Sequence, residues 1–190
     1  MGHRILIIVD PQNDFIDGSL AVEGASEAMS ELAKYLHENK DKYDAIIITL
    51  DWHPADHCSF AEKGGMWPQH CIQFSHGASI YPQIDEEMNS YEGNFLFLTK
   101  GEDSTKEAYS VFEDEENAED FDRFISTFSN PSFDFCGIAA DYCVFNTMKD
   151  FIKRHGSENV SLLNAYTPFI TIQGNDEFMS FIEKNSVSVI

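Results

Sequence analysis

Three polar residues of this chain stand where α/β proteins commonly carry their chemistry. Asp10 and Lys100 each end an apolar, strand-like segment, and Cys143 follows a turn of small residues. Taken singly they have ordinary explanations: a turn carboxylate, a solvated strand end and an inert buried thiol. A thiol at a helix N-terminus close to a lysine should have a lowered pKa. Together the three residues predict a nucleophile (Cys143), a proton shuttle (Asp10) and a cation that holds both anions (Lys100).

A second group has the residue types of a metal site. Asp51 and His53 are two positions apart at the end of another strand-like segment, with His57 and His70 further along the same connection. One carboxylate and up to three imidazoles suit a borderline divalent ion, which leaves zinc, iron and manganese open. The spacing alone is a weak signal, because histidines in a surface loop would look the same. Its position directly after a strand strengthens the metal interpretation.

Aromatic residues flank both groups in the sequence. They are Phe15, Trp67, Tyr109 and Tyr142. Such side chains wall small, flat ligands, although many aromatics simply fill a core. The acidic stretch 113–122 is interpreted instead as a solvated loop and helix start without a catalytic role.

The elements that position these residues alternate along the chain. Apolar, β-branched segments are separated by segments with helical periodicity. Strands are expected at 4–9, 45–50, 94–99, 132–137, 159–163 and 186–190, and helices at 26–39, 118–128, 141–154 and 176–184. This alternation predicts a doubly wound, mostly parallel α/β sheet, whose ligand crevice lies beyond the carboxyl ends of the strands. The connection 51–92 is unusually long and carries four histidines, which is typical of a functional loop.

Length and charge limit the function classes. The 190 residues predict one domain, 1–190, large enough to bury a full core without metal staples or disulfides. A formal net charge of -21 disfavours nucleic acid and anionic membranes as partners. No apolar run is long enough to span a membrane and no CxxC pair occurs, so a cytoplasmic protein with four free thiols is expected.

The chain resembles the nicotinamidases (pyrazinamidases) of the isochorismatase-like cysteine hydrolases. Five sequence blocks carry the resemblance, in the family's order and over nearly the whole chain: 8–22 (IVDPQNDFIDGSLAV), 49–60 (TLDWHPADHCSF), 67–71 (WPQHC), Lys100-Gly101 with 109–112 (YSVF), and 137–144 (GIAADYCV). The combination of an acid, a metal and a thiol block is far more specific than any one of them.

The resemblance implies both an architecture and a site. The sheet should have about six strands with helices on both faces. Asp10, Lys100 and Cys143 should form a catalytic triad, and Asp51, His53 and His70 should hold one divalent metal. His57 matches a position that supplies a further ligand in some members only. The family also carries a cis peptide that would fall here between Ile138 and Ala139, with the amides of Ala139 and Cys143 facing an oxyanion.

Two departures from the family pattern stand out. Phe74 occupies a position of the metal loop where glycine is common, which leaves the shape of the loop exit open. Met148 and Phe151 are larger than usual for the helix after Cys143, which concerns packing rather than chemistry.

The function implied is the hydrolysis of nicotinamide, or of similar amides such as pyrazinamide, to the acid and ammonia, a step of NAD salvage. A Cys143 thioester would be the intermediate, with the metal orienting the pyridine ring. Three alternatives are weighed. A related hydrolase of another small amide would commonly lack the metal set, a vinyl-ether hydrolase would not need Cys143, and a non-catalytic relative would not need an intact triad. The number of subunits, a homo-oligomer included, is left open.

Overall fold

The computed structural model of the chain, which describes residues 2–190, contains one six-stranded parallel sheet. The strand order is β3-β2-β1-β4-β5-β6. The strands are β1 (Arg4–Val9), β2 (Ala45–Asp51), β3 (Asn94–Lys100), β4 (Ser132–Gly137), β5 (Val160–Leu162) and β6 (Ser188–Val189). The expected doubly wound fold class is confirmed. The two last strands are shorter than predicted.

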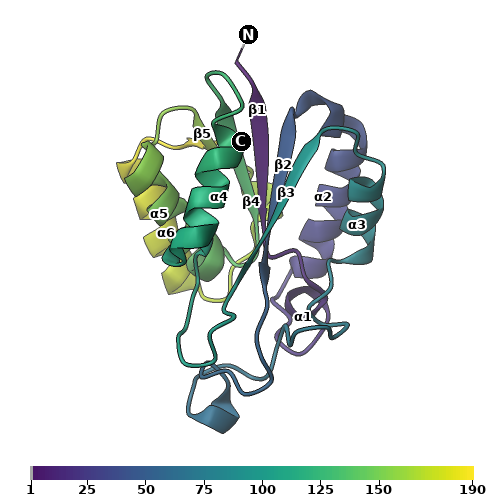
Figure 1. Ribbon diagram of the computed structural model, residues 1–190, viewed down its shortest axis with the longest axis vertical. Coiled ribbons are helices and arrows are strands. Elements are labelled where there is room, and N and C mark those ends of the chain that lie inside the picture. Colours follow the sequence, from purple (N-terminus) through teal and green to yellow (C-terminus); the bar gives the residue numbers. More distant parts are fainter. Residues whose placement is uncertain (1) are drawn as a thin grey trace.

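Helices cover both faces of the sheet (Figure 1). On one face lie α1 (Asn13–Ile16), α2 (Ala25–Asn39) and α3 (Pro82–Asn89), and on the other α4 (Glu115–Ile125), α5 (Phe145–His155) and α6 (Ile172–Lys184). The segment α3 lies inside the connection 51–92, where no helix was predicted. A short π-helical segment, Ala140–Val144, precedes α5, and α6 begins four residues earlier than the predicted residue 176.

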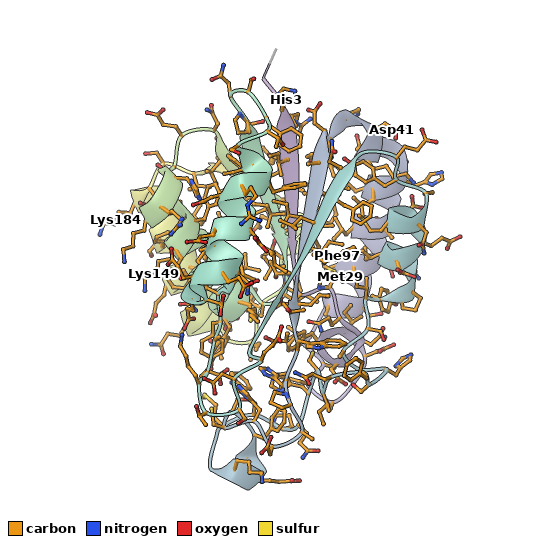
Figure 2. The ribbon with its side chains drawn as sticks, viewed as in Figure 1. His3, Met29, Asp41, Phe97, Lys149 and Lys184 are labelled. Atoms are coloured by element: carbon orange, nitrogen blue, oxygen red, sulfur yellow. The ribbon has the colours of Figure 1, made fainter. Side chains whose placement is uncertain are left out.

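The two layers have separate apolar cores because successive strand side chains point to opposite faces. On β1, Leu6 and Ile8 join the layer of α2, whereas Ile5 and Ile7 join the layer of α4 to α6, and all four are buried. Figure 2 shows side chains filling both layers. Burial on both faces explains why β1 is a continuous apolar run rather than an alternating one.

The carboxyl ends of the strands point to the lower end of Figure 1, where the long connection after β2 extends beyond the sheet. The strand order reverses between β1 and β4, and ligands of such sheets bind in the crevice beyond this switch point.

Asp14 joins the segment after α1 to the long connection after β2, because it accepts hydrogen bonds from the amides of Ser19 (3.1 Å) and Cys71 (2.7 Å). Phe74 has a left-handed φ of 63°, the conformation in which glycine is favoured. Its side chain is 89% exposed and packs edge-on against Trp52. The loop exit therefore accommodates Phe74 by turning it outward. Met148 and Phe151 are buried in the α5 layer, as expected for packing residues.

No helix among residues 2–190 combines the length and the apolar character needed to cross a membrane.

Candidate active site and metal centre

Lys100 lies at the centre of a cluster of buried charges formed by four strand ends. Its Nζ is 2.9 Å from Asp10 Oδ2 and 3.4 Å from Cys143 Sγ, and it also contacts Asp51 Oδ1. Thr49 Oγ1 donates to the other Asp10 oxygen at 2.7 Å. These side chains are all nearly inaccessible to solvent. The structure thus brings together the three residues that the sequence singled out for catalysis.

The two carboxylates of this cluster differ in acidity. Burial tends to raise the pKa of Asp51, but Lys100 and the neighbouring histidines outweigh it and hold this pKa well below its usual range. For Asp10, burial raises the pKa even though Lys100 opposes the rise. Environments that push two acids apart in this way separate their roles. Asp51 is suited to remain an anionic ligand, and Asp10 to accept and return a proton.

The Cys143 thiol does not have the lowered pKa expected from the sequence. Burial raises its pKa well above the usual value, Lys100 opposes the rise, and the charges of Asp10 and Asp51 add to it. A thiolate here would be a third negative charge beside a single ammonium group, which burial makes costly. The expectation from the helix N-terminus was therefore wrong. Asp10 is one of the two carboxylates adjacent to this thiol.

The turn after β4 aims Cys143 at the cleft. Gly137 has φ of 121°, and a Cβ there would collide with the backbone of Val9 on the neighbouring strand. The peptide between Ile138 and Ala139 is cis, as the resemblance implied. The carbonyl of Ala139 accepts hydrogen bonds from the amides of Tyr142 and Val144, each at 3.1 Å. These two bonds close the turn around Cys143.

Asp51, His53 and His70 converge on one point. Their ligand atoms lie within 4.8 Å of one another, and Asp51 Oδ2 is 3.4 Å from His53 Nε2 and 3.6 Å from His70 Nε2. The Nδ1 atoms of the two histidines bond to the carbonyls of Gly101 (2.9 Å) and Pro68 (2.8 Å). Because a carbonyl can only accept, each Nδ1 donates and the rings are fixed; in the neutral form of each ring, Nε2 then carries the free lone pair. His53 Nε2 is buried without a hydrogen-bond partner in residues 2–190, as a metal ligand would be before its ion is added.

His57 lies beside this cluster but is engaged elsewhere. Its ring is 4.1 Å from that of His53, between centroids. Nδ1 bonds to Ser59 Oγ at 2.7 Å, and Nε2 bonds to the carbonyl of Lys106 at 3.0 Å. Both nitrogens are therefore occupied by protein groups. The structure places His57 beside His53 but outside the group of Asp51, His53 and His70.

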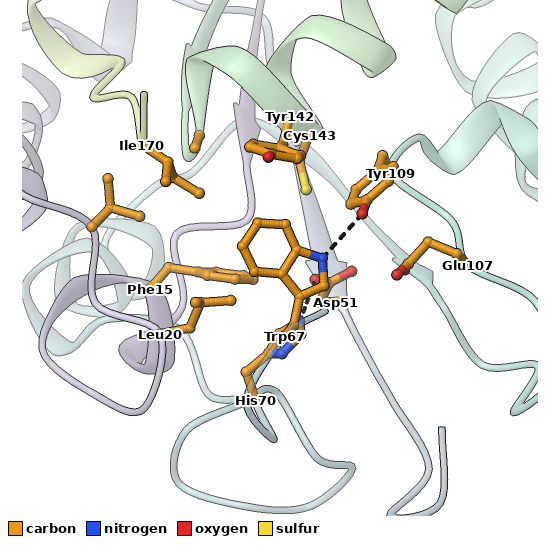
Figure 3. Close-up of a pocket in the computed structure, with 12 residues that line it drawn as sticks. Phe15, Leu20, Asp51, Trp67, His70, Glu107, Tyr109, Tyr142, Cys143 and Ile170 are labelled. Atoms are coloured by element: carbon orange, nitrogen blue, oxygen red, sulfur yellow. Dashed lines mark hydrogen bonds and ion pairs between the residues drawn. The ribbon is translucent and has the colours of Figure 1, made fainter. Parts of the chain in front are cut away.

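A cavity opens beside Cys143, Asp51 and His70 (Figure 3). Phe15, Trp67, Tyr109 and Tyr142 line it, so the structure places all four predicted wall residues around one space. Trp67 Nε1 donates to the Tyr109 hydroxyl at 3.0 Å, which fixes one wall. Ala139 also faces the cavity.

Comparison with known proteins identifies the family. The model of the isochorismatase domain matches residues 4–162. The nicotinamidase/pyrazinamidase of Mycobacterium tuberculosis is 35% identical over 79% of this chain and 79% of its own length. The chain belongs to the nicotinamidases of the isochorismatase-like superfamily. By family it is an amidohydrolase.

Further relatives match over almost their full length. The nicotinamidase of Escherichia coli is 28% identical over 98% of this chain and 92% of its own. A solved pyrazinamidase of Pyrococcus horikoshii in complex with zinc superimposes with a TM-score of 0.82 at 28% identity, covering 99% of this chain and 98% of that one. The structure of PnC1 from L. infantum in complex with nicotinate superimposes with a TM-score of 0.85 at 27% identity, covering 100% of this chain and 92% of that one.

Several residues of the site were not predicted from the sequence. The Gln12 side chain forms hydrogen bonds with both the amide and the carbonyl of Asp51, and the Thr49 hydroxyl donates to Asp10. Leu20, Val22, Glu107 and Ile170 complete the cavity wall. Leu20 and Val22 lie in a block already noted for its family resemblance, and Glu107 is two positions before Tyr109, so nearness in sequence was an available signal. No such signal existed for Ile170, because its place in the wall depends on a hydrogen bond from its amide to Asp141, 29 positions away in the sequence.

Proposed function

We propose that this protein hydrolyses nicotinamide to nicotinate and ammonia through a thioester on Cys143. The observation that carries the proposal is the single lysine, Lys100, that contacts the proposed acid, the proposed nucleophile and the metal-ligand carboxylate at once. Nicotinamidases among the relatives support the substrate, and such a reaction would return nicotinamide to NAD salvage. Pyrazinamide, of the same shape, should also be accepted.

Acylation would use Asp10 as base and acid in turn. Asp10 accepts the thiol proton as Cys143 Sγ attacks the carboxamide carbon, so that a C–S bond forms while the carbonyl oxygen becomes an oxyanion. The amides of Ala139 and Cys143 are proposed to stabilise that oxyanion. Asp10 then protonates the nitrogen, the C–N bond breaks and ammonia leaves. Lys100 stays protonated, because Asp10 and Asp51 outweigh the effect of burial and hold its pKa well above the usual value.

Deacylation would repeat these roles with water. Asp10 removes a proton from the water that attacks the thioester, and the proton returns to the sulfur as the C–S bond breaks. Phe15, Trp67, Tyr109 and Tyr142 would hold the flat ring and limit access of bulk water.

Asp51, His53 and His70 are proposed to hold one divalent ion, zinc being the first candidate. The buried, unpartnered Nε2 of His53 fits such an ion, and the zinc complex of the P. horikoshii relative supports it. When bound, the ion would bind the ring nitrogen and so orient the carboxamide toward Cys143.

An ammonia-release assay with nicotinamide tests the reaction. Substituting Cys143 by Ala should lower kcat by at least about 10³-fold, because the nucleophile is lost. Trapping of a nicotinoyl adduct on the parent protein, detected by mass spectrometry, should fail in the variant. Turnover by Cys143→Ala near the parental rate would contradict the cysteine mechanism.

Metal analysis of the purified protein tests the proposed metal site. The parent should carry about one divalent ion per chain, and Asp51→Asn should carry much less, because a charged ligand becomes neutral. Asp56→Asn is the matched control: Asp56 is exposed on the same loop, so its loss should leave metal content unchanged. Equal metal content in all three proteins would refute the assignment of the site.

A further inference from the structure

The cavity contains one acidic side chain to which the proposed chemistry gives no role. Glu107 lines it together with Cys143 and Asp51, and Figure 3 shows its carboxylate pointing inward. The carboxylate accepts a hydrogen bond from the adjacent amide of Ala108 at 3.2 Å. No lysine, arginine or histidine of residues 2–190 forms an ion pair with it. Glu107 is therefore a partly buried carboxylate of the wall without a direct ion pair.

Glu107 also lies close to the wall residue Tyr109, two positions further along the same segment. Burial raises the pKa of Tyr109 to about 12, a hydrogen bond with Trp67 opposes the rise, and Glu107 adds to it. The charge of Glu107 therefore reaches another side chain that lines the same cavity.

The charges around the cavity do not cancel without an ion. Asp10 and Asp51 share the single ammonium group of Lys100, and Glu107 adds a third carboxylate to the cavity wall. One divalent ion at Asp51, His53 and His70 would bring the formal charges of this set close to neutrality. A neutral carboxamide would then enter without electrostatic cost. Its hydrolysis creates a carboxylate, whose negative charge is new to the balanced cavity. Glu107 is the member of the set whose charge is not offset by a direct ion pair.

We propose that Glu107 is a specificity-determining residue that discriminates between the neutral amide and the anionic acid, and so favours release of the product. The inference rests on the proposed function and extends it. Repulsion between like charges within one partly enclosed site weakens binding of the acid, whereas the amide carries no charge to repel.

Equilibrium binding in the Cys143→Ala background tests this without turnover. Nicotinamide and nicotinate would be titrated by calorimetry into proteins of equal zinc content. Adding Glu107→Gln should tighten nicotinate binding by about 5-fold or more relative to nicotinamide. The effect of the substitution on the ratio of the two dissociation constants, nicotinate to nicotinamide, should shrink as NaCl is raised, because screening weakens the repulsion.

Glu102→Gln is the matched control. Glu102 lies in the same connection but is exposed, accepts a hydrogen bond from Thr99 and is not among the residues that line the cavity. It should leave the ratio unchanged. An unchanged ratio in Glu107→Gln, or parallel shifts for both ligands, would overturn the inference while leaving the proposed function intact. Failure of the Cys143→Ala protein to bind either ligand would overturn both.

Discussion

At the scale of single residues, the position of Asp51 depends on a side chain far away in sequence. Gln12 is fully buried, its Nε2 donates to the carbonyls of Asp51 (2.7 Å) and Ala78 (2.9 Å), and its Oε1 accepts from the Asp51 amide at 2.8 Å. One amide side chain therefore joins the strand end that carries a proposed metal ligand to the far end of the metal loop. Buried backbone groups held in this way become costly when the partner is removed.

Substituting Gln12 by Ala should lower the free energy of unfolding by about 2–4 kcal/mol, because buried backbone groups lose their partner. Urea unfolding of the metal-free protein measures this loss. Gln73→Ala is the control: Gln73 donates once, to the carbonyl of Trp52 at 3.1 Å, and is only partly buried. Its loss should cost less than about 1 kcal/mol. Similar losses of unfolding free energy in the two variants would contradict this role of the Gln12 hydrogen bonds.

Residue type alone predicted three side chains that the fold brings together, but not the residues that hold them in place. Asp10, Lys100 and Cys143 could be named because each is an unusual residue at the end of an apolar segment. Gln12 and Thr49 are ordinary polar residues, and their importance comes from partners 39 positions away. The predicted direction of the Cys143 pKa shift was wrong for the same reason. Local sequence indicates a helix N-terminus, whereas burial beside two carboxylates is a property of the folded site.

At the scale of elements, hydrophobic periodicity predicted which segments form strands and helices, but tertiary contacts decided where several of them begin. The helix α6 starts at Ile172 because the Thr171 side chain caps it, accepting from the amide of Gly174 at 3.0 Å. Thr171 is itself held by Asp141, which accepts from its amide at 2.8 Å. The helix start is therefore linked to the residue two positions before Cys143, a connection that no local pattern reveals.

The same link explains how a remote loop comes to line the cavity. Asp141 also accepts from the amide of Ile170 at 2.9 Å, and the amide of Ala140 donates to the carbonyl of Pro168 at 2.8 Å. The turn that carries Cys143 and the loop that carries the wall residue Ile170 are therefore one hydrogen-bonded unit. A displacement of either segment should therefore move the other.

At the scale of the whole molecule, the fold tolerates an unusually one-sided charge. The chain has 33 acidic residues and 12 basic ones, and two of the basic residues, Lys100 and Arg4, are paired to carboxylates of the sheet. Few cations remain to balance the surface. The acidic stretch 113–122 begins α4, where Asp114 caps the helix and negative charge is favoured. Elsewhere the excess charge is repulsive and favours the expanded, unfolded chain.

Added salt should therefore stabilise the protein. Raising NaCl from about 0.02 M to 0.3 M at pH 7.5 should raise Tm by about 3–6 °C, with little further gain above, because the Debye length is by then shorter than most distances between surface charges. Thermal unfolding followed by circular dichroism measures this. Replacing the exposed residues Glu23 and Glu119 by lysine should reduce the effect, since less repulsion is left to screen. A Tm that is independent of salt, or that falls as salt is added, would mean that the carboxylates are compensated locally and that self-repulsion does not limit stability.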